Sequence, residues 1–163
     1  MIFAIDVHYN PDESAKVAGV LFENWEDATP LKVYTTHIEK VNPYESGSFY
    51  KRELPCILAI LELVQETIEY IVVDGYVYLN DKKGLGAHLY HALNEQISII
   101  GVAKSAFRDI AEQTYLYRGE STKPLYVTSV GVELSQAKEW VETMHGKYRF
   151  PTLLKEVDRL CRE

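Results

Sequence analysis

The chain has 163 residues, of which 47% are hydrophobic and 25% charged, and its formal net charge is −7 at pH 7. This composition is typical of a globular protein, and the length indicates one domain over residues 1–163. The negative charge argues against strong sequence-independent adhesion to nucleic acid or to an anionic membrane, although it leaves room for a local basic groove. No segment approaches the roughly 18 uninterrupted apolar residues of a transmembrane helix, and no basic region marks a signal peptide. Two widely spaced cysteines without a CxxC pair complete the prediction of a cytoplasmic protein.

The N-terminal part of the sequence predicts three strands, at 2–9, 15–22 and 31–39. Each is rich in β-branched and aromatic residues, and the breaks NPDES and NWEDATP carry turn residues, which favours an antiparallel meander. Asp6 stands in the middle of the first strand. A carboxylate at such a position destabilises the fold unless something satisfies it.

Helices and strands then alternate. Apolar residues recur at helical spacing from Leu54 onward, and we expect Pro55 to occupy the first turn of this helix, where its missing N–H does no harm. The segment 106–122 shows no clear pattern. The remaining predicted elements are a strand at 70–75, a helix at 83–95, a strand at 97–103, a strand at 124–130, a helix at 135–146 stopped by Gly146, and a helix at 152–163. This order predicts an α/β fold in which three antiparallel strands are followed by parallel ones, with helices on both sides.

Three carboxylates are candidates for a metal site. Asp6 lies inside the first strand, Asp74 ends the strand 70–75, and Glu53 precedes an apolar helix. Carboxylates that leave positions open for phosphate and water are the usual ligands of Mg²⁺, and such a cation promotes phosphodiester hydrolysis. The residues alone also fit simpler roles for two of them, because Asp-Gly is common in turns and glutamate complements a helix N-terminus.

Lys104 follows the strand 97–103 and is placed either to stabilise negative charge on a phosphoryl group or to extend into solvent. Other catalytic chemistries find no support. The sequence has no clustered Cys and His ligands for zinc and no GxSxG, P-loop or GxGxxG motif.

The loop 42–54 is aromatic and pliable. It contains Tyr44, Gly47, Phe49 and Tyr50, and Lys51-Arg52 add positive charge beside them. Aromatic rings that stack on bases, next to cations that meet phosphate, are what a nucleic-acid contact requires. Ordinary core or surface aromatic residues are the alternative.

The ordered set of these motifs resembles the endonuclease V family, metal-dependent nucleases that cut strands near deaminated purines. The matching stretches are DVHY (6–9), PYESG (43–47), KRE (51–53), VDG (73–75), IGVAK (100–104), PLYV (124–127), SVG (129–131) and GKYRFP (146–151). The resemblance implies a ribonuclease-H-like fold. It also implies Mg²⁺, or Mn²⁺, held by Asp6 and Asp74 with Glu53 in direct or water-mediated contact, and Lys104 near the scissile phosphate.

The resemblance extends to the substrate. It implies that Tyr44 belongs to a wedge that separates or stacks bases, and that Gly47 and Gly75 line the pocket for a flipped deaminated base. The expected reaction is hydrolysis of a phosphodiester on the 3′ side of inosine in DNA or RNA.

The sequence also departs from the family pattern. The family segment D-G-x-G-x-x-H-P-R is replaced at 74–82, where the second glycine, the histidine, the proline and the arginine are missing, and Val132 stands where the family usually has an active-site histidine. We therefore expect a metal-dependent endonuclease with activity impaired at Val132. The alternatives are a weakened relative that binds nucleic acid or a nucleotide without cutting it, and a ribonuclease-H-like domain that performs another metal-assisted hydrolysis.

Overall fold

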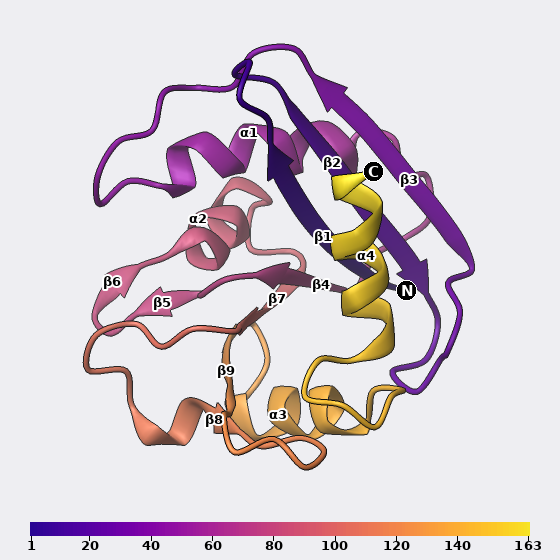
Figure 1. Cartoon of the computed structure of the whole chain (residues 1–163), viewed down its shortest axis with the longest axis vertical. Helices are drawn as coiled ribbons and strands as arrows, with labels where there is room; N and C mark the ends of the chain where they lie inside the picture. The colour runs from indigo at the N-terminus through magenta and orange to yellow at the C-terminus, as the bar shows by residue number, and fades with distance from the viewer.

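A seven-stranded mixed sheet crosses the molecule, as the computed structural model of residues 1–163 shows (Figure 1). The strands lie in the order β3-β2-β1-β4-β7-β9-β8. Their bounds are β1 Ile2–Tyr9, β2 Ala15–Phe22, β3 Lys32–Ile38, β4 Tyr70–Asp74, β7 Ser98–Ala103, β8 Tyr115–Leu116 and β9 Leu125–Val130. A small second sheet pairs β5 (Tyr78–Leu79) with β6 (Lys82–Lys83).

The strand directions confirm the predicted fold class. β1, β2 and β3 form an antiparallel meander, and β4 and β7 join parallel to β1 on its other side. β9 then pairs antiparallel with β7 and carries the short β8 at the edge. None of the helices is long and apolar enough to cross a membrane.

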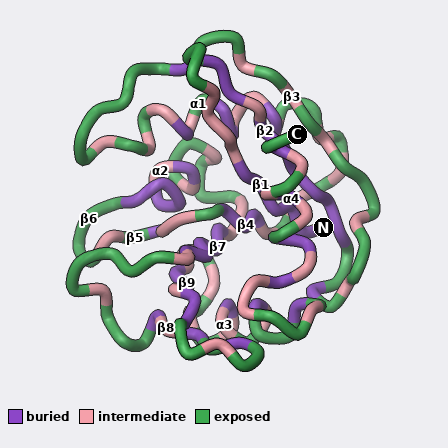
Figure 2. The backbone as a smooth tube through the Cα atoms, viewed as in Figure 1, coloured by how far each residue is buried: buried purple, intermediate pink, exposed green.

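Helices cover the two faces of the sheet because alternate strand residues are apolar on both sides. On one face Ile2, Ala4 and Val20 pack with α3 (Leu134–Thr143) and α4 (Thr152–Arg162). On the other face Phe3 and Ile5 pack with α1 (Tyr50–Leu61) and α2 (Leu85–Ala92). Figure 1 shows α4 lying across β1 and β2, and Figure 2 shows the central strands buried while the loops at the rim are exposed.

A close backbone approach brings the end of β4 over β7. A Cβ at Gly101 in β7 would lie 2.5 Å from the carbonyl oxygen of Gly75, so only glycine fits there. Gly75 itself has a φ of +141°, a conformation that other residues rarely adopt. This contact fixes the Asp74-Gly75 turn above the sheet.

The start of α1 differs from the prediction. The helix begins at Tyr50, so Pro55 lies inside it rather than in its first turn. A proline at this position cannot donate to the carbonyl of Lys51, one helical turn earlier. Asn42 Nδ2 donates to that carbonyl instead, at 3.1 Å, and the helix continues.

Other boundaries also differ. α3 ends at Thr143, before Gly146, and α2 begins at Leu85 after the β5–β6 hairpin, which was not predicted. The unassigned segment 106–122 contains a 3₁₀ turn, Glu112–Thr114, followed by β8.

Candidate active site

Strand register places Asp6 beside Asp74. β1 and β4 are parallel and pair Ile5 with Val73, so the next residue on each strand is an aspartate. Both aspartates continue the alternation of Ala4 and Val72 and therefore face α4. Asp6 is only 8% exposed, and its Oδ1 accepts a hydrogen bond from the Val7 N–H at 2.9 Å.

Glu53 approaches from α1, which packs on the opposite face of the sheet. Its side chain is 8% exposed. Glu53 and Asp74 line one cavity, and Asp6 and Asp74 line a narrow one below it, so Asp74 is common to both. The structure thus gathers the three predicted carboxylates around the adjacent central strands β1 and β4.

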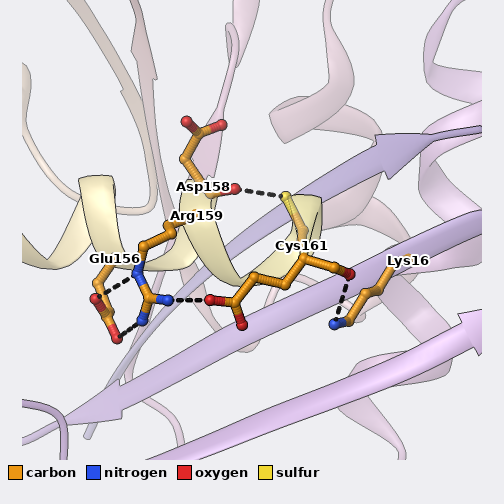
Figure 3. A network of polar contacts seen from close by, with 6 residues as sticks. Lys16, Glu156, Asp158, Arg159 and Cys161 are labelled. Carbon is orange, nitrogen blue, oxygen red and sulfur yellow. Dashed lines mark hydrogen bonds and ion pairs between the residues drawn. The ribbon is translucent and has the colours of Figure 1, made fainter.

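A fourth carboxylate, Asp158 on α4, was missed by the sequence analysis. A ligand oxygen of Asp158 lies within 4.8 Å of one on Asp6, and the Cys161 sulfur lies within the same limit of both. The Cys161 Sγ donates to the Asp158 carbonyl at 3.2 Å, and Figure 3 shows the Asp158 carboxylate leaving α4 on a different side from the Arg159–Glu156 pair. The only sequence signal was an acidic residue bordering the buried stripe of an amphipathic helix.

Burial and mutual repulsion shift the proton affinities of these groups. Burial, followed by the charge of Asp74, raises the pKa of Asp6 to about 7. Burial, followed by the charges of Asp74 and Asp6, raises the pKa of Glu53 to about 8. Asp74 is exposed at the end of β4, yet desolvation by the surrounding protein raises its pKa; Lys104 opposes this shift and Asp158 adds to it. Raised pKa values indicate a negative electrostatic potential at these carboxyls, and the same potential favours the binding of a cation.

Asp158 behaves differently. Burial works to raise its pKa, but hydrogen bonds from Arg162 and from the Asp6 carboxyl outweigh burial and lower it. Of these two neighbouring carboxyls, Asp6 is the one with the raised pKa and Asp158 the one with the lowered pKa. Burial raises the pKa of the Cys161 thiol to about 12, so this sulfur stays protonated. A protonated thiol is a poor ligand for Mg²⁺, which prefers oxygen atoms.

Lys104 lies just past the end of β7, and β7 is the strand next to β4. Its charge lowers the pKa of both Asp74 and Asp158, and Phe150, the ring beside its ammonium, lines the narrow cavity with Asp6 and Asp74. Its Nζ lies 4.4 Å from the centroid of the Phe150 ring.

An aromatic cavity of about 430 Å³ adjoins the carboxylates. The predicted substrate residues Tyr44, Gly47 and Gly75 line it together with Glu53 and Asp74. The Tyr44 ring is 62% exposed, and the Gly47 carbonyl accepts a hydrogen bond from Lys82 Nζ at 3.2 Å. The cavity is large enough for a purine, because small-molecule sites start at roughly 300 Å³. Phe49 and Tyr50 of the aromatic loop also line it, as do Tyr76 and Phe107, which were not predicted.

Val132 lies elsewhere. It lines a separate cavity of about 370 Å³ together with Tyr78 and Ser129, and none of the four carboxylates reaches that cavity. Its carbonyl accepts from Ser129 Oγ at 2.9 Å. The replaced segment 74–82 is accommodated as well, because Val77 packs on Gly86, where a Cβ would lie 2.7 Å from the valine Cγ2.

Known proteins share the sequence pattern and the fold of this chain. The Endonuclease V family model matches residues 1–120. Endonuclease V of Nostoc punctiforme is 28% identical over 181 residues, covering 98% of this chain and 81% of its own length. The crystal structure of Endonuclease V from Streptomyces avermitilis matches with a TM-score of 0.77 and 29% identity, over 99% of this chain and 79% of that one.

A structure of Ciona intestinalis Endonuclease V, in complex with a 23mer DNA containing an inosine followed by a ribo-adenosine, has a TM-score of 0.84 at 21% identity. It covers 99% of this chain and 83% of that one, and at this identity it supports the fold. The chain belongs to the endonuclease V family, a family of nucleases.

Proposed function

We propose that this protein is a Mg²⁺-dependent endonuclease that hydrolyses a phosphodiester bond near a deaminated purine, such as inosine, in DNA or RNA. The observation that carries the proposal is the convergence of Asp6, Asp74, Asp158 and Glu53 beside an aromatic cavity of purine size. The inosine-containing DNA bound by the Ciona relative supports the choice of substrate.

The carboxylates suit a divalent cation. The raised pKa values of Asp6 and Glu53, which come from burial and from neighbouring carboxylates, support a site where a cation is favourable. Carboxylate oxygens are the ligands of Mg²⁺ and Mn²⁺. We assign Asp6, Asp74 and Asp158 as the residues that hold the ion, with Glu53 in direct or water-mediated contact. When bound, such an ion activates water and polarises the phosphoryl oxygen.

The other residues act on the substrate. Glu53 lines the cavity beside Asp74, where its carboxylate is placed to orient the attacking water. Lys104 offsets the charge that develops on the phosphoryl oxygens. Tyr44 stacks on a base at the rim of the cavity, and Gly47 and Gly75 let the extruded base approach the backbone.

The test is cleavage of an end-labelled oligonucleotide that contains one inosine, with Mg²⁺ or with EDTA. An otherwise identical oligonucleotide with guanine is the substrate control. The Asp6→Ala variant removes a carboxylate of the cluster, and Asp81→Asn, an exposed turn residue, is its matched control. We expect cleavage that requires inosine and Mg²⁺, disappears in Asp6→Ala and persists in Asp81→Asn.

Two other outcomes would contradict the proposal. Tight binding of the inosine oligonucleotide without cleavage would favour a relative that recognises nucleic acid but does not cut it. The absence of both binding and cleavage would exclude both nucleic-acid functions. Another metal-assisted hydrolysis would then remain as the alternative.

A further inference from the structure

Two consecutive residues, Arg149 and Phe150, contact the backbone carbonyl and the side-chain ammonium of Lys104. Arg149 Nη2 donates to the backbone carbonyl of Lys104 and also to the carbonyl of Pro124, at 2.6 Å for the latter. Phe150 places its ring 4.4 Å from the Lys104 ammonium. The backbone and the charged tip of one lysine are therefore both fixed by the dipeptide 149–150.

The dipeptide is itself anchored. It lies in the connection between α3 and α4, and the buried guanidinium of Arg118 donates to several carbonyls of this connection. The acceptors are the carbonyls of Met144 at 2.7 Å, Gly146 at 3.0 Å, Tyr148 at 2.6 Å and Arg149 at 3.2 Å. A connection held at so many carbonyls provides a rigid base for the two side chains.

The partners of Arg149 indicate a geometric role. All of its side-chain hydrogen bonds end on backbone carbonyls, and it forms no ion pair with a carboxylate. Phe150 lines the narrow cavity together with Asp6 and Asp74, so its ring borders the carboxylate cluster directly. The pair thus connects the carboxylates with the lysine that follows β7.

Lysine needs such support because its ammonium sits on a flexible four-carbon stem. Stabilisation of a phosphoryl group depends on a charge already in place, and a misplacement of about 1 Å can cost about 100-fold in rate. A ring beneath the ammonium supplies a cation–π attraction that restricts the stem to one direction.

We propose that Arg149 and Phe150 are positioning residues that aim Lys104 at the scissile phosphate. The proposal rests on the nuclease function assigned above to Lys104. It differs from a purely structural role, in which the two residues only stabilise the fold, and from direct contact with nucleic acid.

Single-turnover cleavage of the inosine oligonucleotide tests it with Phe150→Leu and Arg149→Gln, each made alone and combined with Lys104→Met. We expect Phe150→Leu to slow cleavage about 10-fold in the wild-type background, the size of a lost cation–π contact. Arg149→Gln is expected to slow cleavage as well, because the Lys104 carbonyl loses its donor. Binding, measured by fluorescence anisotropy in EDTA, is expected to stay unchanged, and no further loss is expected on the Lys104→Met background. The proposal would be overturned if the variants slowed cleavage further on the Lys104→Met background. It would also be overturned if they weakened oligonucleotide binding, or if the single variants cleaved at the wild-type rate.

The matched control is Tyr148→Leu. It removes an exposed neighbouring ring that lies near Lys147 and Lys155 rather than Lys104, and its rate is expected to equal that of the wild type. Thermal unfolding identifies any variant that fails to fold. Phe150→Leu keeps an apolar side chain and decides the question if Arg149→Gln does not fold.

A spectroscopic readout separates this inference from the nuclease proposal. The ring of Phe150 shifts the NMR resonances of the Lys104 ε-methylene protons upfield, and we expect that shift to disappear in Phe150→Leu, to shrink in Arg149→Gln and to persist in Tyr148→Leu. If the wild type cuts no substrate, the nuclease proposal fails and this shift alone decides the positioning. Unshifted Lys104 resonances in the wild type would then refute it.

Discussion

Replacing Asp6 with asparagine is expected to stabilise the metal-free protein at alkaline pH while abolishing cleavage. The asparagine keeps the side-chain oxygen that accepts the Val7 N–H, and it removes the buried negative charge. The pKa of Asp6 is raised from 3.8 to about 7 in the folded chain, and each pKa unit corresponds to about 1.4 kcal/mol. Ionising Asp6 in the folded state at pH 8 therefore costs on the order of 4 kcal/mol.

The sign follows from the direction of the shift. Because the folded state binds the Asp6 proton more tightly than the unfolded state, the stability that this proton provides is complete below pH 3.8. It is lost as the pH rises toward about 7. The advantage of the asparagine variant is therefore largest at pH 8 and falls below about 1 kcal/mol at pH 4.

The assay is urea unfolding in EDTA at pH 4 and pH 8, with Asp81→Asn as the exposed control. Addition of Mg²⁺ at pH 8 is expected to raise the unfolding free energy of the wild type and to have little effect on Asp6→Asn. A variant that is no more stable than the wild type at pH 8 would refute the reasoning that Asp6 carries uncompensated charge.

Four other substitutions test separate parts of the molecule. Asp158→Asn is expected to weaken Mn²⁺ binding by at least about 10-fold in calorimetry, since it removes a carboxylate beside Asp6; unchanged affinity would exclude Asp158 as a ligand. Tyr44→Ala is expected to weaken oligonucleotide binding by about 1–3 kcal/mol in fluorescence anisotropy, whereas Tyr44→Phe keeps the stacking ring and the affinity. Val132→His is expected to leave the cleavage rate unchanged, because Val132 lines another cavity; a faster enzyme would show that the missing histidine limits activity. Arg118→Met is expected to lower the unfolding free energy by about 3 kcal/mol in urea titrations, since it deprives buried carbonyls of their donor, and a smaller loss would show that water replaces it.

Much of the fold was predictable because it depends on local patterns. The strands at 2–9 and 15–22 and the β4 and β7 segments carry continuous apolar runs, and their order along the chain defines the mixed sheet. The start of α1 was not predictable in this way. Its first turns have little apolar periodicity, and the contact that lets Pro55 sit inside the helix comes from Asn42, outside the helix.

The residues of the candidate site also fall into two groups, those that local sequence patterns predict and those that depend on tertiary packing. Asp6, Glu53 and Asp74 stand in recognisable sequence motifs. The register of β1 and β4 brings Asp6 beside Asp74, whereas Glu53 reaches them from α1. Asp158 was missed because its proximity to Asp6 depends on how α4 docks on the sheet. The expected importance of Val132 came from a family pattern in the linear sequence, which gives no information about the cavity that a residue faces.

The pairing of Asp6 with Asp158 has a consequence for the order of synthesis. The first strand is made early, whereas α4 follows after most of the chain, so a ribosome-bound chain without α4 has only part of the carboxylate cluster. Such a chain also lacks Arg149 and Phe150 until the α3–α4 connection is complete. The complete carboxylate cluster is therefore expected to form only after α4 has been made and the sheet is covered on both faces.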